Sequence, residues 1–183
     1  MEAAMLDVSV AYNRYKFLGH EFLTWLWYMI ENDQDAFQKV DPELASLTIG
    51  NRVVLENHRH NREETITIRG DGAGLEEGLI ALKKGGKVTE LNLVCSFAEY
   101  EWRFQLKGES LGLSGLKVPQ TEKVEKKEDL EGAVLERIFL IEKIVDLTYN
   151  VYNQFLEVRV SDDWDKRTVG EINAWIDKSI AGD

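Results

Sequence analysis

The stretch KVTELNLVCSFAEYEWRFQLK, residues 87–107, decides the fold, because its side chains alternate between apolar and polar in two successive segments. Alternate side chains of a strand point to opposite faces of a sheet. A reversal near Ala98-Glu99 would therefore pair the two segments as an antiparallel hairpin. The apolar set is Thr89, Leu91, Leu93, Cys95, Phe97, Tyr100, Trp102, Phe104 and Leu106. Such a sheet needs a cover on one side only, so its polar side is free to meet water or a ligand.

The length and composition of the chain fit a single globular domain. It has 183 residues, of which 44% are hydrophobic, and this is enough to build a core. We divide it into an N-terminal strand, helix and connector (1–42), a sheet with a short helix (43–120) and C-terminal helices (121–183). The sequence has no run of roughly 18 uncharged apolar residues and no basic-then-apolar signal pattern, so we expect a cytoplasmic protein.

The formal net charge of -11 limits the functions that the chain can have. An acidic protein repels phosphate unless folding gathers its cations in one place, so a nucleic-acid function requires a local basic cluster. No grouping of His, Asp and Ser, of Cys and His, or of paired carboxylates is typical of an enzyme here. The single Cys95 lies on the apolar parity of its strand and is predicted to be a core residue. We therefore expect neither catalysis nor a cofactor.

Residues 16–31, KFLGHEFLTWLWYMIE, are predicted to form a helix that is apolar around most of its circumference. This segment is either a central core helix or an aromatic surface, around Trp25 and Trp27, for a partner or a second copy of the chain. Gly19 and His20 are expected to interrupt the helix early. His20 has no second metal ligand at helical spacing, so we interpret it as a structural residue.

The rest of the chain shows the periods of strands and helices in turn. Residues 8–12 alternate as a short strand, residues 32–42 form a polar connector, and residues 47–55 indicate one or two strands around Gly50-Asn51. Further elements are expected as a strand at 64–69, a short helix at 75–84, a strand or loop at 108–119, a charged linker at 121–131, a long helix from about 129 to 160, and a last helix capped by Ser161-Asp162-Asp163. The whole predicts an α+β domain, with an antiparallel sheet packed against a long C-terminal helix and an aromatic-rich N-terminal helix.

The long helix carries two apolar stripes, and two stripes imply two packing partners. One stripe is Leu130, Val134, Ile138, Ile141, Val145, Tyr152 and Phe155, and the other is Leu140, Ile144, Leu147 and Val151. The apolar face of the sheet is one expected partner. The second is either the 16–31 helix or another subunit.

Two patterns resemble binding motifs and are better explained as turns. His58 and His60 share a face of a strand with Glu56, which is one way to begin a zinc site, but a solvated hairpin tip explains them more simply. The glycines of residues 70–74 lack the Lys-Ser/Thr pair of a phosphate-binding loop and the spacing of a dinucleotide-binding one.

The basic residues nearest to one another along the predicted path define a candidate DNA-binding surface. Lys83, Lys84 and Lys87 form the densest positive cluster without an acid inside it, and the path from strand to helix to strand is expected to bring Arg69 beside them. The polar face of the hairpin adds Arg103 and Lys107, and Lys117 follows in the next strand. Lysines that face phosphates give sequence-neutral binding that weakens with salt.

Two segments carry a resemblance to a known family. GKVTELNLVCSFAEYEWRFQLKGESLGLSGLK, residues 86–117, followed by ERIFLIEKIVDLTYNVYNQFL, residues 136–156, resembles the C-terminal part of the recombination-associated protein RdgC family. The matching features are the Gly-Lys that opens a strand, a return strand with Phe-x-Leu, a Ser-Leu-x-x-Leu-Lys segment and the periodic helix. The resemblance covers about residues 53–156 and does not extend to the family's N-terminal portion, which supplies part of the ring closure.

The resemblance implies a non-enzymatic DNA-binding protein of bacterial recombination. Members of the family form ring-shaped dimers that admit duplex DNA without reading its sequence, and they limit access of the RecA recombinase. Lys87 falls on a family lysine and Arg69 falls near another basic position. From this resemblance we expect a homodimer that binds double-stranded DNA, is associated with the nucleoid and antagonises RecA.

Two other classes of function remain open from the residues alone. The sheet and long helix could enclose an apolar cavity for a small ligand, lined by the surplus of Trp and Tyr. The second stripe of the long helix, together with Trp25 and Trp27, could instead make the chain a protein-binding adaptor.

Overall fold

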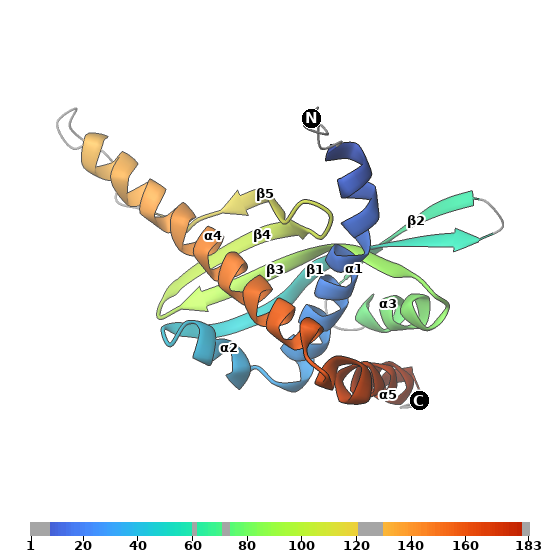
Figure 1. The fold of residues 1–183 in the computed structure, drawn as a ribbon. Coiled ribbons are helices and arrows are strands. Elements are labelled where there is room, and N and C mark those ends of the chain that lie inside the picture. Colours follow the sequence, from blue (N-terminus) through green and yellow to red (C-terminus); the bar gives the residue numbers. More distant parts are fainter. Residues whose placement is uncertain (1–7, 60–61, 71–73, 121–129, 181–183) are drawn as a thin grey trace, which may run out of the picture.

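The computed structural model describes residues 8–59, 62–70, 74–120 and 130–180, and its elements form an α+β fold (Figure 1). In chain order they are α1 (Val8–Asn32), α2 (Asp35–Val40), β1 (Leu44–Arg59), β2 (Arg62–Arg69), α3 (Gly74–Lys83), β3 (Lys87–Phe97), β4 (Tyr100–Lys107), β5 (Gly112–Lys117), α4 (Leu130–Val160), the π-helical turn η2 (Trp164–Thr168) and α5 (Val169–Ile180). The predicted fold class is confirmed. Residues 121–129 of the predicted charged linker lie outside the described residues, and residues 130 and 131 already belong to α4.

The strands form one antiparallel sheet in the order β2-β1-β3-β4-β5. β1 is a single strand of 16 residues that pairs with β2 on one side and β3 on the other. Its register to β3 shifts between Ile49 and Val53 and again between Val54 and Leu55. Because irregularities of this kind increase the twist of a strand, β1 bends, and its far end forms with β2 the hairpin that projects to the right in Figure 1.

The hairpin of β3 and β4 reverses at the predicted Ala98-Glu99 turn and has the predicted faces. Leu91 lies opposite Leu106, Leu93 opposite Phe104 and Cys95 opposite Trp102, and all of these side chains are buried. The turn uses Ala98 at a positive φ of 51°. Cys95 is fully buried, as predicted for a core residue, and this burial raises the pKa of its thiol to about 12.

Helix α1 is the central core helix of the molecule. Trp25 and Trp27 are 1% and 0% exposed, so the alternative prediction that they form a partner surface is wrong. The expected strand at residues 8–12 is wrong too, since α1 already begins at Val8. Gly19 does not interrupt the helix. It lets α1 pass the loop after β4, because a Cβ at this position would stand 2.1 Å from the carbonyl oxygen of Gly108.

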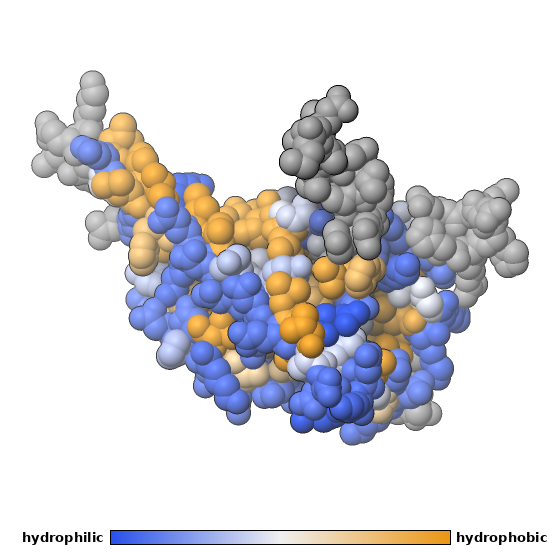
Figure 2. Space-filling model, in the orientation of Figure 1, coloured by the Kyte–Doolittle hydropathy of each residue, from blue (hydrophilic) through white to orange (hydrophobic). Residues whose placement is uncertain are grey.

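Helix α4 packs along only part of its length. One predicted stripe, with Ile144, Leu147 and Val151, is buried against the core, and the indole of Trp102 donates a hydrogen bond to the Leu140 carbonyl at 3.0 Å. The N-terminal half projects beyond the sheet and carries an apolar surface (Figures 1 and 2). Its exposed side chains are Leu130, Val134, Leu135, Ile138, Phe139, Ile141, Val145 and Tyr149.

Two local predictions about helix ends are corrected. The connector after α1 contains α2, which buries Ala36 and Phe37. The predicted cap of the last helix is wrong, because the Ser161 hydroxyl donates back to the Val158 carbonyl at 2.7 Å. The two aspartates after Ser161 pair instead with Lys166 and Arg167 one turn later. None of the described helices combines the length and apolarity that crossing a bilayer needs.

Candidate nucleic-acid interface

The two faces of the sheet differ in what covers them. In Figure 1 the helices α1 and α4 cross in front of the sheet, while α3 packs on the same side through Gly78, whose position adjoins Trp27 of α1 and Ile68 of β2. The side chains of opposite parity point to the other side, which we call the open face. Its charged members, read from the strand register, are Arg52, Arg69, Glu56, Glu90, Glu101, Arg103, Lys107 and Lys117.

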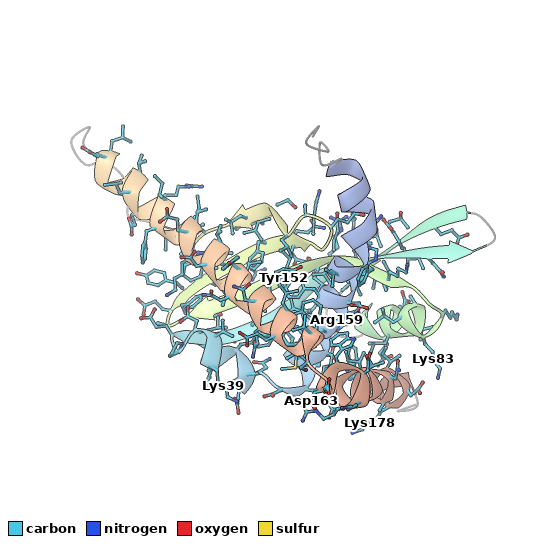
Figure 3. All side chains as sticks on the ribbon, in the orientation of Figure 1. Lys39, Lys83, Tyr152, Arg159, Asp163 and Lys178 are labelled. Atoms are coloured by element: carbon cyan, nitrogen blue, oxygen red, sulfur yellow. The ribbon has the colours of Figure 1, made fainter. Side chains whose placement is uncertain are left out.

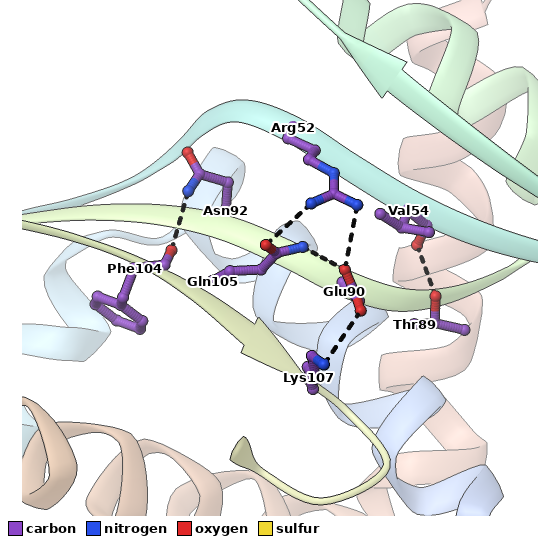
Figure 4. Close-up of polar contacts among 8 residues, drawn as sticks. All are labelled: Arg52, Val54, Thr89, Glu90, Asn92, Phe104, Gln105 and Lys107. Atoms are coloured by element: carbon purple, nitrogen blue, oxygen red, sulfur yellow. Dashed lines mark hydrogen bonds and ion pairs between the residues drawn. The ribbon is translucent and has the colours of Figure 1, made fainter. Parts of the chain in front are cut away.

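The centre of the open face is a polar network around Glu90 (Figure 4). Arg52 donates a hydrogen bond from Nη1 to Gln105 Oε1 at 3.1 Å, and the amide of Gln105 donates to the Glu90 carboxylate. Arg52 Nη2 lies 3.6 Å from Glu90, and Lys107 Nζ lies 4.0 Å from it. A single carboxylate thus orients two cations from two different strands, at distances that leave both cations with free donor capacity.

Neighbouring contacts hold the strands of the open face in place. Asn92 donates from Nδ2 to the Phe104 carbonyl at 3.1 Å and accepts a hydrogen bond from the backbone of Asn51 at 3.3 Å. Gly50 is required there, because a Cβ would stand 2.1 Å from Asn92 Oδ1. Arg103 pairs with Glu101 at 2.7 Å, and both side chains are about half exposed.

The open face carries more cations than carboxylates, although the whole chain is acidic. Among the side chains that the structure describes, and apart from Lys87 at the start of β3, its cations are Arg52, Arg69, Arg103, Lys107 and Lys117, and its carboxylates are Glu56, Glu90 and Glu101. Arg69 and Lys117 form no ion pair with another described residue. Positive charge is therefore concentrated on the side of the sheet that the described helices leave uncovered.

The structure does not bring the seven predicted DNA-binding residues together on one surface. Four of them lie on the open face, namely Arg69, Arg103, Lys107 and Lys117. Lys83 and Lys84 lie at or beyond the end of α3 on the helical side, where Lys83 is labelled in Figure 3, and Lys87 is the first residue of β3, opposite Glu56. Lys83 pairs with Asp177 of α5 at 2.9 Å, and Lys87 lines a cavity together with residues of α1 and α5.

The expected meeting of Arg69 with the lysine cluster does not occur. Arg69 lies opposite Arg52 on β1, whereas Lys87 lies opposite Glu56, four residues further along the same strand. Four residues of strand correspond to about 13 Å. Helix α3 lies on the helical side of the sheet and carries Lys83 toward α5, so this lysine is separated from Arg69.

Sequence reasoning missed Arg52, although a signal for it was present. Val53 and Leu55 were recognised as strand residues, and Arg52 has the opposite parity to both. Parity alone would have placed its side chain on the polar face. The register confirms this placement, because Arg52 shares the open face with Gln105 and Glu90.

Two hollows on the helical side are candidates for small ligands. A cavity of about 360 Å³ lies between α1, α3 and α5, and it is bordered by His20, Lys87 and Trp164. A groove of about 440 Å³ between β5 and α4 is almost entirely apolar. The groove is lined by Leu111, Leu113, Leu116, Ile141, Val145, Thr148 and Tyr149, so it continues the exposed apolar surface of α4.

Among the described residues, one group has the composition of a metal site. His20, Glu56 and Glu109 come from α1, β1 and the loop after β4, and one potential ligand atom of each lies within 4.8 Å of the others. Glu56 thus lies close to His20 and Glu109, whereas the order of residues along its strand had grouped it with His58 and His60. The side chains of His58 and His60, with which a zinc site was considered, lie outside the described residues.

Comparisons of the chain with protein-family models, with curated proteins and with solved structures found no match. The resemblance to the RdgC family therefore stays a prediction from the sequence segments that carry it.

Proposed function

We propose that the protein binds nucleic acid without sequence preference, through the open face of its sheet. The observation that carries this proposal is the excess of cations on that face in a chain whose formal net charge is -11. Together with the family resemblance, it favours duplex DNA as the ligand and a role in bacterial recombination control, including restriction of RecA access. Such a protein acts in the cytoplasm, at the nucleoid, and needs no catalytic residue.

The chemistry of the open face suits phosphate contacts better than base readout. Arginine and lysine are the side chains that neutralise phosphates, and each such contact releases counterions from the DNA. The strands carry Arg69 on β2, Arg52 on β1, Arg103 and Lys107 on β4, and Lys117 on β5. Cations spread over four strands contact a backbone in several places, and this gives affinity without a sequence code.

The contacts around Glu90 suggest how the surface changes when it binds. In the free protein Glu90 balances Arg52 and Lys107 at 3.6 and 4.0 Å. These are long, partly exposed ion pairs, which are worth little in water. A phosphate can therefore replace Glu90 as the partner of either cation at low cost, while Arg69 and Lys117 have no described carboxylate to exchange.

A salt series tests the proposal directly. Binding of labelled duplex DNA is measured by fluorescence anisotropy between 50 and 200 mM salt, with two unrelated sequences of equal length. Four or five phosphate contacts predict an affinity that falls by about 100- to 500-fold over this range, equally for both sequences. Lys117→Ala should lower the slope by about one contact. Saturable binding that does not depend on salt, or no binding at 50 mM, would refute the proposal.

A second candidate function is self-association through the projecting half of α4. Phe139 and Leu135 are 62% and 60% exposed, and the apolar groove between β5 and α4 lies along the same side. Isolated exposed apolar residues are common, but a continuous apolar helix surface is typical of an interface. A homodimer would also double the number of cations available to DNA.

Sedimentation velocity tests the dimer. The wild-type chain should sediment as a dimer, and Leu135→Ser with Phe139→Ser should shift it to the monomer. Glu142→Ser is the matched control, because it changes an exposed residue of the same helix without removing apolar surface. If the wild-type chain is a monomer at all concentrations, the dimer proposal is refuted. The apolar surface of α4 would then bind a different protein, as the adaptor alternative states.

A further inference from the structure

The group formed by His20, Glu56 and Glu109 lies where three separate parts of the chain meet. α1 passes close to the loop after β4 at Gly19, one residue before His20. Glu109 belongs to that loop, and Glu56 comes from the bent end of β1. The helix, the strand and the loop are each fixed by the core, so the approach of the three side chains follows from the fold and not from a single local motif.

The imidazole of His20 has no partner although it is buried. His20 is only 8% exposed. Both of its ring nitrogens are shielded from solvent, and neither makes a hydrogen bond in the described structure. A buried polar atom without a partner costs roughly 1–3 kcal/mol. The lone pair of an imidazole nitrogen in this position can bind a metal ion. Such a bond would remove the free-energy cost of leaving the buried nitrogen without a partner.

The spacing of the three groups suits a shared ion. Ligand atoms about 2.1 Å from one metal lie at most about 4.2 Å apart, and the three potential ligand atoms already lie within 4.8 Å of one another. Small rotations of the two glutamates close the difference. Both carboxylates remain reachable from solvent, since Glu56 and Glu109 are 25% and 29% exposed.

In the structure the ammonium of Lys16 balances the negative charge of the two glutamates. Its ammonium lies 2.5 Å from Glu109 and 3.6 Å from Glu56, one turn before His20 on α1. The ammonium satisfies the carboxylates but makes no hydrogen bond to the imidazole. Burial, together with the charges of Lys16 and Lys87, lowers the pKa of His20 against the opposing effect of the two glutamates, so the ring is available in its neutral form.

We propose that His20, Glu56 and Glu109 bind a divalent first-row transition-metal ion, with the flexible Lys16 side chain displaced outward when the ion enters. One imidazole nitrogen and two carboxylates form a mixed donor set that suits Mn²⁺, Fe²⁺, Co²⁺ and Zn²⁺ better than Ca²⁺ or Mg²⁺. Three protein ligands leave further coordination positions for water. The ion would join α1 to the sheet and to the loop after β4.

Cavities on both sides of the group give access for an ion and its water ligands. The cavity between α1, α3 and α5 reaches His20. A second hollow of about 220 Å³ on the other side is lined by Glu56 and Glu109, together with Glu90 and Lys107 of the open face. This second hollow places the metal site beside the proposed DNA-binding surface, but the site depends on no property of that surface.

Co²⁺ is the probe for the test, because its visible absorption reports ligation by imidazole and carboxylate. The metal-free full-length protein is titrated with Co²⁺, and Zn²⁺ is then added as a competitor. We expect one saturable Co²⁺ site that Zn²⁺ displaces. Glu56→Gln and Glu109→Gln should each weaken binding by at least about tenfold. Lys16→Met should strengthen it, because the competing ammonium is gone.

Matched variants separate this site from other metal-binding residues. Glu43→Gln removes an equally charged glutamate that pairs with Lys143 at 2.6 Å and does not belong to the group around His20, and it should leave Co²⁺ affinity unchanged. His58→Ala with His60→Ala should also leave it unchanged. The variant His20→Gln removes the imidazole ligand itself. If it fails to fold, as judged by circular dichroism, the Co²⁺ affinities of Lys16→Met and Glu109→Gln still test whether the site exists.

The inference is overturned if no saturable Co²⁺ binding occurs at millimolar metal. It is also overturned if binding persists at full strength in both glutamine variants, or if it disappears with His58 and His60. In each of these cases the three residues form only an ion-pair cluster around Lys16.

Discussion

The two faces of one hairpin, β3 with β4, show how differently neighbouring residues of a strand are used. On the covered face Leu93 and Phe104 are 2% exposed and pack against α1 and α4. On the open face Asn92 and Gln105, each one residue away, make hydrogen bonds that remain partly accessible to water. The covered face supplies stability, so the open face can change its charges and its partners without loss of the fold.

The largest expected difference between the faces is in thiol reactivity. Cys95 is buried and the pKa of its thiol is raised to about 12, so only a very small fraction is thiolate at pH 8. Ser96→Cys puts a second thiol on the open face at the next residue. We expect it to react with a disulfide reagent about 1,000-fold faster than Cys95 in the native protein. Equal rates for the two thiols would show that the covered face is open to solvent.

The next largest difference is in stability. Phe104→Ala removes a ring from the core and should lower the free energy of unfolding by about 3–5 kcal/mol. Gln105→Ala, at the adjacent position, should cost about 1 kcal/mol, because it removes two partly buried hydrogen bonds, to Arg52 and Glu90. Urea unfolding followed by tryptophan fluorescence measures both variants. Similar losses would contradict the assignment of the two faces.

A smaller difference concerns how closely the helices approach the covered side. Gly19→Ala should destabilise the protein by about 1–3 kcal/mol, because the added methyl would collide with the backbone of Gly108. Gly132→Ala, in the projecting part of α4 where no atom lies within 4 Å of the added Cβ, should stabilise it by about 0.5–1 kcal/mol. The same unfolding experiment checks both, and two changes of equal sign would argue against the close contact at Gly19.

The faces of single elements could be predicted from the sequence because each depends on a local period. The period of two in residues 87–107 placed Leu93 inward and Arg103 outward. The periodicity of the long helix separated the buried Ile144 and Leu147 from the exposed Val134. These assignments require only that neighbouring residues obey the geometry of a strand or a helix.

The relations between elements could not be predicted in the same way. The sequence places Lys83 near Arg69 along the chain, but nothing local shows that α3 carries this lysine to the helical side of the sheet, beside α5. The group of His20, Glu56 and Glu109 draws on three separate elements and has no spacing signature. The assignment of Ser161 as a cap followed a common pattern, and here its hydroxyl bonds to the preceding turn instead.

The central claim is that DNA binds to the open face and not to the helical side, and one paired measurement tests it most directly. Arg103→Glu with Lys107→Glu reverses two charges on the open face, and Lys83→Glu with Lys84→Glu makes the same change in net charge on the other side. Duplex binding at 50 mM salt, measured by anisotropy, should weaken at least about tenfold in the first variant, with a salt slope reduced by about two contacts. The second variant should bind nearly as the wild type does. The claim is contradicted if the lysine variant loses the greater part of the affinity while the open-face variant keeps it.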